Sequence, residues 1–171
     1  MEKLSRKKIT ELLSSTGELS GFDLSGIDLR ELDLSRVNLK SSILKGSNLS
    51  YVNLSKSDLE DADLSGCDLS GANFTGANMR HADITKADMG FSILIGADLS
   101  NSKLTGVNLK LANLSAANLE NTELGNADLQ QAEAAAARFT GARMKRVNAY
   151  GASMIAADFS KADLEGADFT K

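Results

Sequence analysis

The stretch Asp63–Asp83, DLSGCDLSGANFTGANMRHAD, carries an apolar residue at every fifth position: Leu64, Leu69, Phe74 and Met79. An α-helix brings apolar residues to one face about every 3.6 residues, and a β-strand about every 2. Positions five apart drift around a helix by about 140° and alternate between the two faces of a flat strand. The interval therefore indicates a chain that bends once in every repeat.

The same interval continues without an insertion or deletion from Leu19 to Phe169. Two residues before each apolar centre lies a small residue, most often Ala, and the residue just before the centre is usually Asp or Asn. We predict that the centre and the small residue point inward, and that each repeat forms one side of a closed coil. Glycines such as Gly26, Gly66 and Gly76 permit the positive φ of a tight bend, while Asp and Asn side chains can accept hydrogen bonds from nearby backbone amides.

Composition agrees with a stack of such coils. The 171 residues include 5% aromatics, no Trp and no Pro, so the core must be narrow and the hydrogen-bonded ladder need not be interrupted. The net charge of −4 favours neither direct binding to nucleic acid nor attachment to an anionic membrane. The single cysteine, Cys67, excludes an intrachain disulfide and fits a reducing compartment. The first fifteen residues lack the apolar core of a signal peptide, and no later segment could span a bilayer, so we expect a cytoplasmic protein.

The number of sides per coil is open from the residues alone, since three and four are both conceivable; Phe139 and Phe159, twenty residues apart, hint at four. The pattern A-(D/N)-L-x-x, seen as ADLSG, ANFTG, ANMRH and ADFSK, resembles the pentapeptide repeat family over residues 19–169. The resemblance implies an all-β solenoid, a right-handed quadrilateral parallel β-helix with four repeats per coil. It implies nearly eight coils, about 36 Å long at the spacing of paired strands, and a long unbroken repeat of the kind common in cyanobacterial chains.

The two ends of the repeat differ. We predict that residues 1–17 form a short capping helix, with Gly17 at its C-terminal end and one broad apolar face: Leu4, Ile9, Leu12 and Leu13. The repeat domain then covers residues 18–171. Such a cap covers an open core and unpaired strand edges; the alternative is a helix that lies on a membrane surface. The C-terminal coils have no cap and carry bulky centres. We expect these coils to form a homodimer interface that contains Phe159, Leu164 and Phe169. The alternative is that they fray in a monomer.

No combination of residues predicts catalysis. His81, the only histidine, falls at an outward position, and Cys67 falls at the small inward position, where burial makes a thiol inert. Nucleophile and base are therefore not paired, and we expect no enzyme activity. The five-residue period differs from the nine-residue period of calcium-binding repeats, and no phosphate-binding glycine motif is present, so we expect no metal and no cofactor.

Function must then lie on the outer surface. Around residues 89–98, Phe91 points outward, Ile93 replaces the usual Asp or Asn, and Ile95 replaces the usual Ser or Thr. With four sides per coil, Leu111 stacks on Phe91. Exposed apolar side chains gathered on one face indicate an interaction site; the alternative is a locally irregular repeat with Ile93 favoured by its β propensity. We predict a rod-shaped scaffold or regulator whose partner is another protein.

The family resemblance implies a second hypothesis. Some pentapeptide repeat proteins mimic a DNA duplex and bind DNA gyrase or topoisomerase IV. One column here is acidic, with Asp at 28, 68, 88, 128 and 168 and Asn between them. Three features argue against mimicry: the small net charge, the absence of any projecting loop, and a basic cluster of Arg138, Arg143, Lys145 and Arg146. The simplest interpretation of that cluster is a set of solvated surface charges without a binding role.

Overall fold

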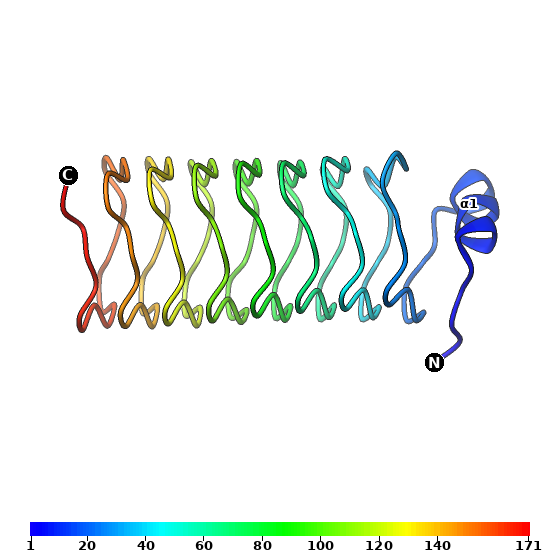
Figure 1. Ribbon diagram of the computed structural model, residues 1–171, viewed down its shortest axis with the longest axis horizontal. Helices are drawn as coiled ribbons and strands as arrows, with labels where there is room; N and C mark the ends of the chain where they lie inside the picture. Colours follow the sequence, from blue (N-terminus) through cyan, green and yellow to red (C-terminus); the bar gives the residue numbers. More distant parts are fainter.

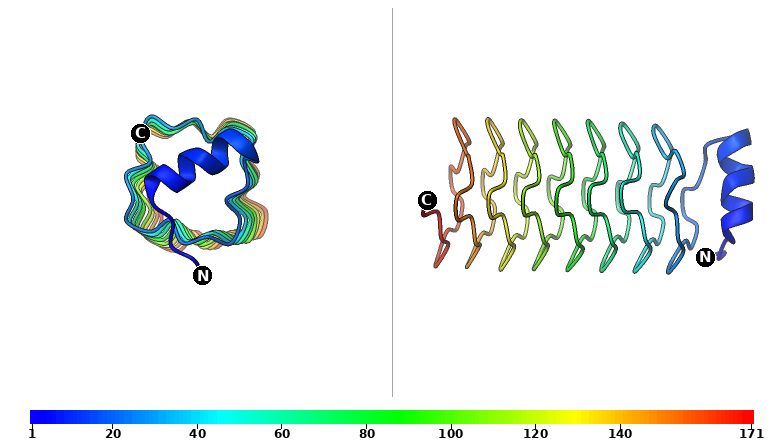
Figure 2. Two further views of the ribbon diagram at one scale, coloured as in Figure 1. Left: turned by 90° about the vertical axis from the view of Figure 1, so that its right-hand side faces the viewer. Right: turned by 45° about the horizontal axis from the view of Figure 1, so that its top comes forward.

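The computed structural model describes residues 1–171 as a straight rod with a single helix at one end (Figure 1). Every β-bridge is parallel and joins residues twenty apart, as in the series Asp28, Asn48, Asp68 and Asp88. Four five-residue repeats therefore complete one coil, and the prediction of four sides is confirmed. Viewed along the rod, the coils superimpose on a square outline (Figure 2).

The β structure consists of single-residue bridges, from the pair Lys3 and Asp23 to the pair Asn148 and Asp168. The bridging residue is the one before each apolar centre. The centre's own N–H donates to the following coil, as from Leu64 to the carbonyl of Asp83 at 2.7 Å. In a typical inner repeat, the amides of the centre and of the second residue after it bond to the following coil, and the amide of the bridging residue bonds to the preceding coil. The coils are therefore joined on all four sides.

Helix α1 spans Arg6–Ser15, and Ser5 is its N-cap. The Ser5 side chain accepts a hydrogen bond from the Lys8 amide at 3.3 Å, and Gly17, just past the helix, has a φ of 67°. The predicted capping helix is confirmed, but it begins at Arg6 because the residues before it are extended. Lys3 pairs with Asp23 as a parallel bridge, so the chain adds one more side to the stack before α1 crosses the open end (Figure 2).

Three bulky residues of the first coil explain how α1 fits over it. Ile9 of α1 is fully buried, and Leu12 and Leu13 are partly buried against the core. Beneath them, the small inward position that is usually Ala holds larger, partly buried side chains: Phe22, Ile27 and Leu32. They fill the space between a helix and a coil of different shape. The Arg6 guanidinium adds hydrogen bonds to the backbone carbonyls of Asp28 and Arg30.

The corners share one backbone geometry. The second residue after each centre has a positive φ in all corners from Gly21 to Gly166, and nineteen of these residues are not glycine. A hydrogen bond closes every turn from the one that ends at Leu32 onward, as from the Ala77 amide to the Phe74 carbonyl at 2.9 Å. The Asp or Asn side chain before the centre accepts the remaining amide, as Asp23 does from Ser25 at 2.9 Å. The predicted use of glycine in the bends is confirmed, and the structure extends the same φ to bulkier residues.

Candidate interaction surface

The four residues Phe91, Ile93, Ile95 and Leu111, here called the apolar cluster, lie on one side of the rod. Their exposed fractions are 64%, 39%, 40% and 47%. The Phe91 amide donates to the Lys110 carbonyl at 2.9 Å, and Ile93 bridges Asn113, so Leu111 sits one coil beyond Phe91. The sequence-predicted site residues are therefore neighbours in space.

The backbone explains why these side chains point outward. Phe91 and Leu111 occupy the corner position, with φ of 59° and 57°. Ile93 occupies the bridging position, where its amide donates to the Ala72 carbonyl at 2.9 Å, and its side chain projects from the face. An Asn or Asp there would accept a hydrogen bond from the amide two residues on. Ile93 cannot do so, which leaves the Ile95 amide without that bond.

Ser92 lies directly beneath the apolar cluster, and nothing in the sequence singled it out. Its side chain is 1% exposed, and its hydroxyl has no hydrogen-bond partner. Other buried hydroxyls at the same position donate to a backbone carbonyl, as Ser57 does to Leu54 at 2.6 Å and Ser47 does to Leu24 at 2.7 Å. The coil that carries the cluster is thus the one coil with an unpaired buried hydroxyl.

Two more exposed side chains belong to the same side of the rod. Tyr51 is 79% exposed and Ile155 is 74% exposed. The Tyr51 ring lies over Gly71 of the next coil, where a Cβ would come within 2.5 Å of the ring. Gly71 therefore makes room for the ring, which extends toward the corner that holds Phe91.

A single face with almost no charge, here called the uncharged face, contains the apolar cluster, Ser92 and Ile155, and Tyr51 lies at its edge, one coil before it. We define it as the five segments 71–76, 91–96, 111–116, 131–136 and 151–156, which stack one coil apart. Glu133 is the only charged residue among them, in a chain that is 25% charged. Its carboxylate accepts a hydrogen bond from the Asn113 side chain at 3.1 Å. The uncharged face extends well beyond the apolar cluster, from the third coil to the last.

The acidic column lies on the adjacent side. Its members bridge one another in order from Asp28 to Asp168. Hydrogen bonds from the Arg30 side chain and backbone lower the pKa of Asp28 to about 2, and Thr170 lowers the pKa of Asp168 in the same way. Because hydrogen bonds to a carboxylate favour its charged form, these groups stabilise turns, and Lys110 also pairs with Asp128 at 3.1 Å.

Three of the four basic residues of the run near residue 140 form ion pairs with neighbouring coils, and Arg146 forms none. Arg138 pairs with Glu120, Arg143 with Glu123 at 3.2 Å, and Lys145 with Glu165 at 2.6 Å. These side chains do not form one free cationic surface, which agrees with the interpretation of a solvated charge run.

Candidate catalytic groups are kept apart. The Cys67 side chain is buried and lies 2.9 Å from the Leu44 carbonyl, and burial raises the pKa of its thiol to about 12. His81 is an exposed corner residue with a φ of 59°. No group of His, Cys, Asp and Glu side chains is arranged to hold a metal ion.

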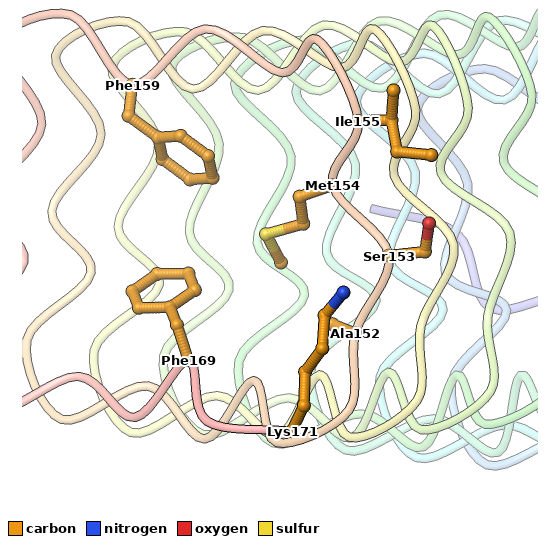
Figure 3. Close-up of a pocket in the computed structure, with 7 residues that line it drawn as sticks. All are labelled: Ala152, Ser153, Met154, Ile155, Phe159, Phe169 and Lys171. Carbon is orange, nitrogen blue, oxygen red and sulfur yellow. The ribbon is translucent and has the colours of Figure 1, made fainter.

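The C-terminal end is open. The amides of Met154, Phe159, Leu164 and Phe169 have no backbone acceptor, whereas the corresponding amides of earlier coils do. Leu164 and Phe169 are 38% and 39% exposed. Phe159 stacks on Phe139 with ring centres 5.0 Å apart and meets Phe169 edge-on at 5.7 Å. A shallow cavity of about 350 Å³ opens here, lined by Met154, Ile155, Phe159 and Phe169 among others (Figure 3).

A rod of square coils with Asx-stabilised corners and an apolar centre every fifth residue defines a quadrilateral solenoid. The sequence matches the family of pentapeptide repeats over residues 23–61, 53–90, 92–133 and 135–170. The chain belongs to the pentapeptide repeat family, and its fold is the right-handed β-helix expected above. Helix α1, with ten residues, falls short of a membrane span.

Several solved structures are similar to this chain. HetL, a pentapeptide repeat protein involved in heterocyst differentiation regulation in the cyanobacterium Nostoc sp. strain PCC 7120, is 31% identical over 88% of this chain and 77% of its own, with a TM-score of 0.37. Rfr23 from the cyanobacterium Cyanothece 51142 is 19% identical over 96% of this chain and 95% of its own, with a TM-score of 0.42. QnrB1, a plasmid-mediated fluoroquinolone resistance protein, is 20% identical over 98% of this chain and 88% of its own, with a TM-score of 0.48. No curated protein sequence matches the chain.

Proposed function

We propose that this chain is a non-enzymatic, rod-shaped protein-binding module that acts in the cytoplasm as a regulator or scaffold. Its contact residues are those of the apolar cluster, Phe91, Ile93, Ile95 and Leu111. The observation that supports this most is their gathering: four large apolar side chains, each more than a third exposed, lie on two consecutive coils. Apolar surface concentrated in this way is typical of a binding site, whereas single exposed apolar residues are ordinary.

Rigidity suits this function. Each coil is bonded to its neighbours on four sides, so the contact residues are held at fixed spacing before a partner arrives. A pre-ordered surface loses little conformational entropy on binding. The partner can therefore be recognised by a small number of side chains.

The test is affinity capture from the native cell lysate with a variant that removes the cluster without disturbing the corner. Phe91→Gly/Leu111→Gly is suited to this because glycine accepts the positive φ found at both positions. A matched control is Asn101→Gly/Asn121→Gly, with φ of 60° and 56° at the diagonally opposite corner. We expect a protein that binds the wild type and the control but not the cluster variant. Equal recovery by all three would contradict the assignment of this surface.

The acidic column supports one alternative function, a DNA mimic that binds DNA gyrase or topoisomerase IV. Five Asp residues occupy a single column of the rod. Its pairing with Arg30 and Lys110 reduces the negative charge available to a partner. This alternative predicts inhibition of DNA supercoiling that weakens as salt is raised, and an unchanged supercoiling rate at low salt would exclude it.

We also propose a two-fold homodimer through the C-terminal coils, with Phe159, Leu164 and Phe169 in the interface. Unpaired amides and partly exposed apolar centres at this end support the proposal, because an open edge readily pairs with another chain. Light scattering at micromolar concentration should give twice the mass of the chain. A monomer mass would contradict the dimer.

A further inference from the structure

We propose that the whole uncharged face is the docking surface, and that its occupant is an amphipathic α-helix of a partner protein lying along the rod. This inference rests on the proposed function, but it adds the kind of segment that binds and its direction. It also extends the contact from the apolar cluster to the last coil, where Ile155 lies on the same face.

Up to its last segment, 151–156, the backbone of the face leaves no place for an added strand. Ile93, Asn113 and Glu133 each donate their amide to the preceding coil at 2.9 Å. The amide of the centre next to each of them bonds to the following coil, as from Leu94 to the Asn113 carbonyl at 2.7 Å. A partner that binds by extending a sheet needs free edge groups, so contacts on this face must be made by side chains.

The dimensions of the face fit one helix. Its flat part is three extended residues wide, about 10 Å, and a helix with its side chains is about 10–12 Å across. Five coils at about 4.8 Å cover about 24 Å, which a helix spans in about 16 residues. The coil spacing is also close to the helical pitch of about 5.4 Å, so successive turns of a helix can meet successive coils.

A second copy of this chain is a poorer occupant. The footprint of about 24 Å by 10 Å is far below the roughly 800 Å² that each partner buries in a stable dimer. A helix can make up part of the difference because its flanking side chains reach past the corners.

Charge indicates the composition of that helix. The face itself has one charged residue in five coils, Glu133, so the facing stripe should be apolar. The border next to Phe91 is acidic: of the Asp residues of the column beside these five segments, Asp68 and Asp88 form no ion pair, and Asp128 is paired with Lys110. Complementary potentials then favour Lys or Arg along one side of the helix's apolar stripe.

The experiment is photo-cross-linking in native lysate, with p-benzoylphenylalanine placed at Thr75, Ser115 or Ile155. These positions share one corner of the uncharged face and are two coils apart. The control positions are Ser65, Thr105 and Lys145, which share the diagonally opposite corner. Two coils cover about 9.6 Å, which corresponds to about six residues of a helix but about three residues of an extended segment.

We expect the three face positions to cross-link to one segment of one protein, in order, at sites about six residues apart, while the control positions give no such series. Sites about three residues apart, or sites scattered over unrelated segments, would overturn the helix while leaving the protein-binding function in place. No cross-link from any face position, together with equal capture by the wild type and Phe91→Gly/Leu111→Gly, would overturn the function itself.

A register variant tests the continuity of the face. Deleting residues 117–126 removes two sides, so the later coils turn by two sides and Ile155 moves to the diagonally opposite corner. Deleting residues 117–136 removes a whole coil and leaves Ile155 on the face. We expect the first deletion to abolish the Ile155 cross-link but not the Thr75 cross-link, and the second to keep both. An Ile155 cross-link that survives the first deletion would contradict a continuous docking surface.

Discussion

Ala116 and Ala117 are neighbours in the chain, yet replacing each with glycine should change stability in opposite directions. Ala116 is an exposed corner residue with a φ of 57°. Ala117 is the small inward residue of the next repeat and is fully buried. Ala136 and Ala137 form the same pair one coil further on, with a φ of 56° at Ala136.

The magnitudes follow from the backbone and the burial. A left-handed conformation costs an L-residue about 1–2 kcal/mol, whereas glycine loses about 0.5–1 kcal/mol more backbone entropy than alanine on folding. Ala116→Gly should therefore raise the free energy of unfolding by about 0.5–1 kcal/mol. Ala117→Gly should lower it by about 1.5 kcal/mol, from the buried methyl group and the backbone entropy together.

Thermal unfolding followed by circular dichroism measures both effects. For a chain of this size, 1 kcal/mol corresponds to about 2–4 °C in the midpoint. The pair Ala116→Gly/Ala136→Gly should gain about 2–8 °C, and Ala117→Gly/Ala137→Gly should lose a larger amount. A loss of stability in the corner variant would refute the argument that these corners hold strained L-residues.

Three further outcomes are expected. Leu114→Arg places an unpaired charge in the core, where Leu114 is fully buried, and should abolish the cooperative unfolding transition in calorimetry. The control Leu114→Met should retain that transition. A normal transition in the arginine variant would contradict the burial of this centre. Ser92→Ala removes the unpaired buried hydroxyl and should raise the free energy of unfolding in urea by about 1 kcal/mol, so a loss would show that the hydroxyl is paired. The pKa values of Asp23, Asp28 and Asp168 are lowered in the folded chain, to about 2 for Asp28. The stability that these carboxylates contribute should be complete above the unfolded Asp pKa of about 3.9 and should be lost as the pH falls below it. Thermal unfolding midpoints that stay constant at pH 6, 4, 3 and 2 would contradict this.

The repeat interval alone indicated which residues are buried, because every centre meets the same requirement. Leu64, Phe74 and Met79 are all fully buried, as the interval of five requires. The number of sides was not accessible in the same way. One repeat looks like the next, so three or four sides satisfy the same pattern, and only the pairing of residues twenty apart decides between them.

The exposure of Phe91 and Leu111 could be inferred from their places in the repeat, but their backbone conformation could not. Neither residue favours a positive φ; each adopts it because the coils on both sides set the position of the corner. The uncharged face was also hidden. Its segments lie twenty residues apart in the sequence, and only stacking shows that Glu133 is the sole charge among them. The unpaired hydroxyl of Ser92 depends on the rotamer and leaves no mark in the sequence.

The helix-covered end comes first in the chain, and this has a consequence for synthesis on the ribosome. Each new coil needs a finished coil to pair with, and α1 with the extended residues before it shields the first one from solvent and from other chains. At an elongation rate of about 5–20 residues per second, one coil of twenty residues emerges every few seconds, far longer than a short segment needs to close on a template. The rod can therefore be wound as it is made, with only its newest edge unpaired at any moment.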